Sequence, residues 1–306
     1  MVELKNISLK YNIPHKKNTA ALENVNAEFG EGKISVIIGP SGCGKTSLVR
    51  IMAGLLKPAK GEVIIRGNPV SGVSKSTAVI FQDYGLLPWK TVRANAELPL
   101  RFYRGIKTGG REAGRQKADG KKAGSREQKT GRLKNSRLKI GLLLEKFGLA
   151  GFAGHYPNQL SGGMKQRLAI VRALVTEPDL LLMDEPFSSL DAISREEAQD
   201  YFITVKKELK ATIIMVTHSI EEAVYLGDAV YVMAGKNPGT LNQCRSYFEI
   251  KREGESNLRF RENPQFAEYC GLLRKTLKLP GREPQDRCAA DAPCESGGNE
   301  SGGSVQ

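Results

Sequence analysis

The sequence predicts an α/β fold with a mainly parallel central sheet. Four short apolar runs have the pattern of strands buried on both faces, at residues 34–38, 180–183, 212–216 and 229–233. Helical apolar spacing occupies stretches between them, at residues 46–53, 164–175 and 194–209. Strands and helices that alternate in this way form parallel sheets, because each return crossing is made by a helix.

Further elements flank this alternation. Residues 2–11 carry apolar side chains on alternate positions, which is typical of a strand with one buried face. Short strands are also expected at residues 61–66 and 78–81, and helices at 92–103, 138–147 and 264–277.

The net charge of +13 comes from one segment. Residues 104–139 hold thirteen Lys and Arg against three Asp and Glu, and the rest of the chain is close to neutral. Residues 104–137 are rich in Gly, Lys, Arg and Ser, which predicts a flexible, solvated insert. The charge therefore says little about the fold.

The composition argues against several classes of protein. No run of 18 apolar residues occurs, so we expect no spanning helix, and the first residues lack the apolar core of a secretory signal. Five scattered cysteines without Cys-x-x-Cys spacing argue against a disulfide framework or a zinc site and suit a reducing cytosol. Residues 280–306 have almost no apolar side chains, which predicts a disordered tail.

A glycine-rich motif follows the first buried strand. It reads Gly39-Pro40-Ser41-Gly42-Cys43-Gly44-Lys45-Thr46 and is followed by Ser47. The glycines let successive backbone N–H groups curl around a phosphate, Lys45 adds positive charge at the outer phosphate oxygens, and the Thr46 hydroxyl suits Mg²⁺. A chance match is expected in roughly 1% of chains of this length. Because a strand and a helix flank the motif as well, it predicts a nucleotide site.

Two acidic residues end the strand at residues 180–183. The carboxyl end of a parallel strand lies at the crevice where such sheets bind ligands. We expect Asp184 to hold Mg²⁺, directly or through water, and Glu185 to polarise an attacking water as a general base. A solvated strand end is the ordinary alternative, and the phosphate motif in the same chain favours catalysis.

A third motif, Leu160-Ser161-Gly162-Gly163-Met164, opens a helix that we expect to begin near Met164. Unpaired N–H groups at a helix N-terminus bind anions, although serine is also a common helix cap. The order of the motifs favours the anion site: phosphate loop, Leu-Ser-Gly-Gly, Asp-Glu and then a histidine.

With these motifs the sequence resembles the ABC ATPase family over about residues 1–235. The resemblance implies a P-loop NTPase core, an N-terminal antiparallel β subdomain and an inserted α-helical subdomain at about residues 83–176. The ATPase domain would then occupy residues 1–240, with the basic insert at about 104–137, and a helix-containing extension residues 241–279. In this family two subunits pack head to tail, and each ATP lies between the phosphate loop of one and the Leu-Ser-Gly-Gly segment of the other.

The resemblance also assigns roles to single residues. Gln82 matches a glutamine that senses Mg²⁺ and the attacking water, and His218 matches a switch histidine at the γ-phosphate. Tyr11 matches an aromatic residue that stacks on adenine, although ordinary packing in a strand is the alternative. Residues 188–191 match a loop that crosses the dimer interface. The candidates for catalysis are therefore Glu185, His218, Lys45 and Gln82.

Smaller features are similar to importer ATPases of the nitrate, sulfonate and taurine branch. They are Met164 in place of a common Gln, Leu86-Leu87-Pro88-Trp89, His155-Tyr156-Pro157 and Asn263-Pro264. Trp89 is the only tryptophan, and we expect it either near the groove that receives the permease or packed in the helical subdomain.

The implied function is ATP hydrolysis with Mg²⁺ that energises uptake of a small solute at the cytoplasmic side of the membrane. The implied partners are a second ATPase subunit, a two-subunit integral-membrane permease and, indirectly, an extracytoplasmic solute-binding protein. The basic insert is either a solvated loop or a contact for anionic lipid headgroups.

Two other classes compete with this interpretation. The first is a non-transport ABC ATPase that acts on nucleic acid; a single cassette and an insert without heptads disfavour it, so no nucleic-acid partner is expected. The second is a P-loop kinase or GTPase, in which Leu-Ser-Gly-Gly has no role.

Overall fold

The computed structural model describes residues 1–11, 19–105, 138–206, 209–233, 247–252 and 257–278. Most of the predicted basic insert, residues 106–137, and the predicted tail lie outside these residues. Within the described ranges, no helix has the length and apolar character needed to cross a membrane.

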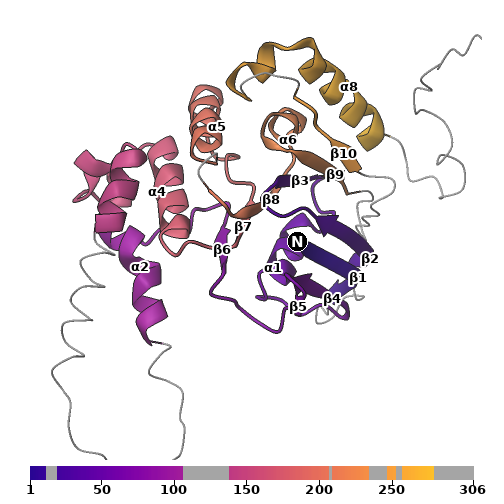
Figure 1. Cartoon of the computed structure of the whole chain (residues 1–306), viewed down its shortest axis with the longest axis horizontal. Helices are drawn as coiled ribbons and strands as arrows, with labels where there is room; N and C mark the ends of the chain where they lie inside the picture. The colour runs from indigo at the N-terminus through magenta and orange to yellow at the C-terminus, as the bar shows by residue number, and fades with distance from the viewer. Residues whose placement is uncertain (12–18, 106–137, 207–208, 234–246, 253–256, 279–306) are drawn as a thin grey trace, which may run out of the picture.

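A six-stranded sheet lies at the centre of the molecule (Figure 1). Its strand order is β10-β9-β3-β8-β7-β6, and the neighbours are parallel except at the β10 edge. The strands are β3 Ile34–Ile38, β6 Thr77–Ile80, β7 Leu180–Asp184, β8 Thr212–Thr217, β9 Ala229–Val232 and β10 Tyr247–Glu249. The predicted parallel α/β sheet is confirmed. The sequence did not reveal β10, because a three-residue edge strand leaves almost no periodic pattern.

The N-terminal strands form a separate antiparallel sheet. Its order is β2-β1-β4-β5, with β1 Val2–Tyr11, β2 Thr19–Phe29, β4 Lys60–Ile65 and β5 Asn68–Pro69. Strand β2 was not predicted, because its alternation of buried residues is interrupted. Asn24 adopts a left-handed φ of 47°, and the register with β1 shifts on either side of the Ile7–Val25 pair. Such a bulge changes which face the following residues occupy.

Helices cover both faces of the central sheet. Helix α1, Lys45–Met52, lies between the two sheets, and α4 Gly162–Leu174, α5 Ala192–Lys206, α6 Ile220–Leu226 and α8 Pro264–Lys278 lie on the other side. Helix α2, Val92–Gly105, packs on α4 beyond β6, near residues 138–146, which are also helical (Figure 1). Three short 3₁₀ helices complete the described structure, η2 Ala150–Phe152, η3 Pro157–Gln159 and η4 Asn257–Glu262.

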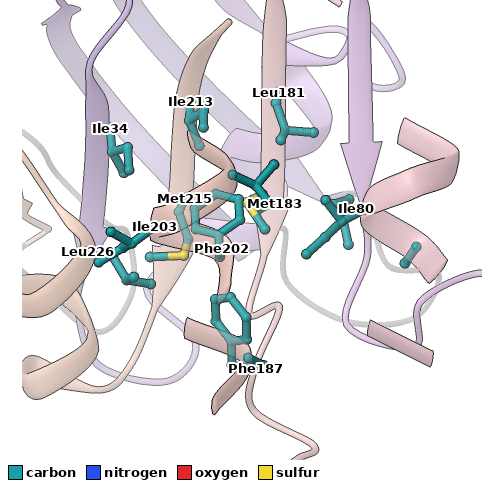
Figure 2. Packing of buried hydrophobic residues seen from close by; sticks show 14 of the residues in the cluster. Ile34, Ile80, Leu181, Met183, Phe187, Phe202, Ile203, Ile213, Met215 and Leu226 are labelled. Carbon is teal, nitrogen blue, oxygen red and sulfur yellow. The ribbon is translucent and has the colours of Figure 1, made fainter. Parts of the chain in front are cut away.

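Alternation along the buried strands divides the core in two. On one face, strand residues such as Leu181, Met183, Ile213 and Met215 gather with Phe202 and Ile203 of α5 (Figure 2). The intervening strand residues belong to a second cluster with α1 and the antiparallel sheet. Burial of each large apolar side chain contributes about 1.5–3 kcal/mol relative to exposure. The strand ends that carry the motifs are therefore fixed from both faces.

Candidate functional site

The glycine-rich loop connects β3 to α1, and two of its glycines are required by their surroundings. Gly44 adopts φ +98°, and a Cβ there would lie 2.6 Å from Leu22 Cδ2 and 2.7 Å from the Ala21 carbonyl oxygen. A Cβ on Gly39 would lie 2.8 Å from the carbonyl oxygen of Met233. Both positions therefore exclude a side chain, and they bring the loop close to β2 and to the end of β9.

The Lys45 side chain is buried inside this loop. Its Nζ donates hydrogen bonds to the carbonyl oxygens of Gly39, at 2.8 Å, and Pro40, at 3.1 Å. Burial raises the pKa of the neighbouring Cys43 thiol, which favours its neutral form. The Lys45 ammonium therefore binds two neutral carbonyl oxygens. The charged oxygens of a phosphate accept hydrogen bonds more strongly and can replace them.

Thr46 and Asp184 meet at the amino end of α1. The Thr46 hydroxyl donates a hydrogen bond to Asp184 Oδ1 at 3.1 Å. Burial raises the pKa of the Asp184 carboxyl, while this hydrogen bond and the charges of Arg50 and Lys45 act in the opposite direction. Among the residues that the structure describes, no group of three or more His, Cys, Asp and Glu could hold a metal ion. A hydroxyl beside one carboxylate instead suits Mg²⁺, which takes oxygen ligands and often completes its shell with substrate phosphates and water.

Glu185 continues β7 in a strained backbone conformation. Its φ is +47°, which costs on the order of 1 kcal/mol or more for a residue other than glycine. Its N–H donates to the Val216 carbonyl oxygen at 3.0 Å, and its own carbonyl accepts from the Ser188 hydroxyl at 2.9 Å. This turn places Glu185 Oε2 at 3.1 Å from Nδ1 of His218, which follows β8.

A hollow of about 310 Å³ lies over the phosphate loop. Its lining consists of Tyr11, Ala21, Gly42, Gly44, Lys45, Thr46, Ser47 and Glu185. The Tyr11 hydroxyl lies 2.9 Å from Ser47 Oγ, so the last residue of β1 is fixed to the first turn of α1. The fold therefore brings together predicted site residues from three distant parts of the sequence.

The Leu-Ser-Gly-Gly motif lies elsewhere. Ser161 caps α4, where its Oγ accepts a hydrogen bond from the Met164 N–H at 3.3 Å, so the helix begins at Gly162 rather than near Met164. A Cβ on Gly162 would lie 2.8 Å from Leu190 Cδ2. The described lining of the hollow includes neither Ser161 nor the two glycines.

Gln82 is exposed in the turn that follows β6. Because Ile80 pairs with Met183 in the parallel register, this turn lies at the same sheet edge as Asp184. Sequence reasoning missed the residues that fix the turn. The Tyr84 hydroxyl lies 2.5 Å from Ser189 Oγ, and the Arg172 guanidinium donates to the Tyr84 carbonyl at 2.6 Å. These contacts join the turn to the loop at residues 188–191 and to α4, and no spacing in the sequence signals them.

Comparisons with known proteins agree with this arrangement. A family model described as ABC transporter matches residues 22–188. An uncharacterized ABC transporter ATP-binding protein of Methanocaldococcus jannaschii is 38% identical over 259 residues, which are 84% of each chain. The taurine import ATP-binding protein TauB of Yersinia pestis is 37% identical over 80% of this chain and 87% of that protein, and TauB of Pelagibacter ubique is 36% identical over 78% and 80%.

Solved structures show the same similarity. One is a bacterial ABC transporter cassette that was determined as a dimer. The match covers 82% of this chain and 100% of the cassette, with a TM-score of 0.62 and 29% sequence identity. A structure of that cassette in a post-hydrolysis state, bound to ADP and Pi, gives a TM-score of 0.61 and 30% identity over the same share of this chain.

Proposed function

This chain belongs to the ABC transporter family as an ATP-binding, ATP-hydrolysing cassette, and from this premise we propose that it energises uptake of a small solute through a separate permease. The solute would be of the taurine, sulfonate or nitrate kind. The observation that carries this proposal is the similarity, over about four fifths of the chain, to taurine import ATP-binding proteins of two organisms.

ATP would occupy the hollow over the phosphate loop. Residues 39–46 would surround the β- and γ-phosphates with backbone N–H groups, and Lys45 would exchange its carbonyl acceptors for phosphate oxygens. The Tyr11 ring, fixed by Ser47 at the rim, would stack on adenine. The remaining loop residues, Pro40, Ser41, Gly42 and Cys43, shape the loop that follows β3.

Thr46, Asp184 and Gln82 are the residues that would hold Mg²⁺. The metal, when bound, neutralises charge that develops on the phosphate oxygens. The Thr46 hydroxyl donates a hydrogen bond to the buried carboxylate of Asp184, so the two oxygen ligands already lie side by side. Gln82 would join these two metal ligands from the turn that follows the neighbouring strand β6. The same turn would link the metal site to the helices beyond β6.

Glu185 and His218 would carry the chemical step. We assign Glu185 as the general base that orients and deprotonates the attacking water, because this residue lines the hollow beside the phosphate loop. His218, in contact with that carboxylate, would donate a hydrogen bond to the γ-phosphate as negative charge develops there.

Two subunits would complete each site. Ser161, Gly162 and Gly163 lie at the exposed start of α4, outside the hollow of their own chain. At a helix N-terminus they would supply unpaired N–H groups to ATP held by a second copy. The dimeric state of the solved relative supports the pairing of two copies.

The permease would dock beside Trp89, whose side chain is 70% exposed. Buried Asn95 holds the turn that carries Trp89: its Oδ1 accepts from the Leu87 N–H at 2.8 Å, and its Nδ2 donates to the Lys90 carbonyl at 2.9 Å. The N–H of Val92 donates to the His155 carbonyl at 2.8 Å, which brings the exposed Tyr156 to the same region. An exposed aromatic residue on a rigid turn is typical of a binding hot spot.

The test is reconstitution with a candidate sulfonate permease and solute-binding protein of the same organism, in liposomes that contain ATP on the cassette side. We expect taurine or another sulfonate to stimulate ATP hydrolysis and to enter the liposomes. Trp89→Ala should keep basal hydrolysis and lose the stimulation. Salt-sensitive DNA binding, together with hydrolysis that no permease stimulates, would contradict transport and favour an ATPase that acts on nucleic acid.

A further inference from the structure

Helix α6 begins two residues after His218, and the C-terminal part of the chain lies against it. Helix α8 lies above α6 in Figure 1, and η4 contacts both α5 and α6. Three arginines of this C-terminal part, Arg252, Arg261 and Arg274, contact α6 or the turn that ends it; we call them the arginine clamp.

The clamp contacts α6 from one end to the other. Arg274 forms an ion pair with Glu221 in the first turn, and the Arg261 guanidinium lies 3.7 Å from the ring centroid of Tyr225. The Arg252 side chain is 8% exposed and donates to carbonyl oxygens at the end of the helix, at 3.2 Å to Val224, 3.1 Å to Tyr225 and 2.6 Å to Gly227. A cation at this end also complements the helix dipole.

A chain of hydrogen bonds leads from Arg261 to the residues on either side of His218. Arg261 Nη2 donates to Gln199 Oε1 at 2.6 Å, and Gln199 Nε2 donates to Glu222 Oε1 at 3.3 Å. The Thr217 hydroxyl donates to Glu222 Oε2 and accepts from the Ser219 N–H at 3.1 Å. Glu222 closes the network, because its N–H donates to Ser219 Oγ at 3.1 Å.

The middle of this chain is buried, so its partners are not replaced by water. Gln199, Thr217 and Glu222 are each 5% exposed or less. Burial raises the pKa of the Glu222 carboxyl, and the hydrogen bonds from Thr217 and Gln199 counteract that effect. Apolar residues would pack α6 at less cost than a buried carboxylate, which stabilises a fold only when its hydrogen bonds are complete.

We propose that Arg261 is a positioning residue for ATP hydrolysis, which acts through Gln199, Glu222 and Thr217 to hold His218 opposite Glu185. The inference rests on the proposed role of His218. Arg261 fixes the orientation of the Gln199 amide, because a guanidinium can only donate and therefore binds the amide oxygen, which turns the N–H₂ group toward Glu222. Without Arg261 the amide is free to rotate, Glu222 loses a donor and the backbone at Thr217 and Ser219 loosens.

Nucleotide binding should be spared by this loss. None of the residues in the chain from Arg261 to Ser219 is among those that line the hollow. For Arg261→Gln in the full chain we expect kcat for ATP hydrolysis to fall on the order of threefold to tenfold, while KM for ATP changes less than about twofold. Arg259→Gln is the matched control, because Arg259 is an exposed arginine of the same segment.

A double-mutant cycle with His218→Ala separates positioning from general stabilisation. If Arg261 acts through His218, Arg261→Gln should have no further effect on kcat in the His218→Ala background. Equal additional losses in both backgrounds, or equal effects of the Arg259 and Arg261 variants, would overturn the inference and leave the proposed function intact. An unchanged kcat in His218→Ala itself would overturn both this inference and the proposed role of His218.

Gln199→Met provides a second variant if Arg261→Gln loosens the C-terminal part. It leaves the contacts of all three arginines with α6 in place and removes the Gln199 amide, with its hydrogen bonds to Arg261 and to Glu222. We expect the same fall in kcat, again dependent on His218, with the thermal unfolding midpoint measured alongside. Undiminished kcat in folded Gln199→Met would overturn the inference.

Discussion

Glu185 and His218 face each other across the edge of the central sheet, with 3.1 Å between Oε2 and Nδ1. Parallel pairing of Asp184 with Val216 sets this approach, because it aligns the ends of β7 and β8. Glu185→Gln keeps the size of the side chain but removes the base. We expect ATP to bind normally and hydrolysis to slow by about 10²–10⁴-fold in single-turnover assays.

An ATP-bound dimer should then accumulate, and size-exclusion chromatography with ATP would detect it. Glu177→Gln is the matched control, since Glu177 is also a glutamate with positive φ but precedes β7 at the opposite end. Hydrolysis by Glu185→Gln at the wild-type rate would show that Glu185 is not the base.

Lys45 affects binding rather than the chemical step alone. Its ammonium is buried against two loop carbonyls, so Lys45→Ala removes the charge that compensates the phosphates. A charged hydrogen bond contributes about 1.5–3 kcal/mol, so ATP affinity should fall by about 10- to 100-fold in calorimetric titration. Lys33→Ala, at the opposite end of β3 in an exposed ion pair with Glu249, should bind ATP as the wild type does.

The pKa of Asp184 predicts a pH dependence of stability. Burial raises this pKa above its value in the unfolded chain, so between the two pKa values the folded state binds more protons at this site than the unfolded state. In metal-free buffer, ionisation of Asp184 should therefore lower the free energy of unfolding as pH rises through the raised pKa. Asp184→Asn removes that loss and keeps an acceptor for Thr46.

Urea unfolding of both proteins in EDTA, from acid to neutral pH, would measure this difference. We expect Asp184→Asn to gain stability relative to the wild type as pH rises, and to lose the stabilisation that Mg²⁺ and ATP together give the wild type. A difference in stability between the two proteins that does not change with pH would show that burial is not the dominant effect on this carboxyl.

The sequence was sufficient to predict the glycine-rich loop and the parallel sheet around it. The glycine-rich motif is one continuous stretch of eight residues, and Glu185 follows a strand whose burial makes it a continuous apolar run that ends in Asp184. Each of these signals is local. Parallel pairing then brings the strand ends to one edge without any further information from the sequence.

Other features could not be predicted because no local pattern records them. The chain from Arg261 through Gln199 and Glu222 to Thr217 joins η4, α5, α6 and β8, and its members follow no common spacing. Polar residues of this kind are mostly exposed in proteins, whereas Gln199 and Glu222 are buried with partners from other elements. Only tertiary structure shows such compensation.

The position of Ser161 predicts that each site uses residues of two chains. Ser161 is exposed at the start of α4 and does not line its own hollow, so Ser161→Arg should bind ATP as the wild type does and fail to hydrolyse it. The arginine side chain would occupy the space in which the phosphates of ATP bound to the second subunit would lie. A loss of ATP binding by the isolated subunit would contradict this arrangement.

Mixing two inactive variants tests the same arrangement directly. In a mixed dimer of Lys45→Ala with Ser161→Arg, one site would combine an intact Lys45 from one chain with an intact Ser161 from the other, while the second site would carry both changes. If the sites are shared, the mixture should hydrolyse ATP faster than either variant alone. If each chain instead formed its site from its own Lys45 and Ser161, both sites of the mixed dimer would be defective, and mixing would restore nothing.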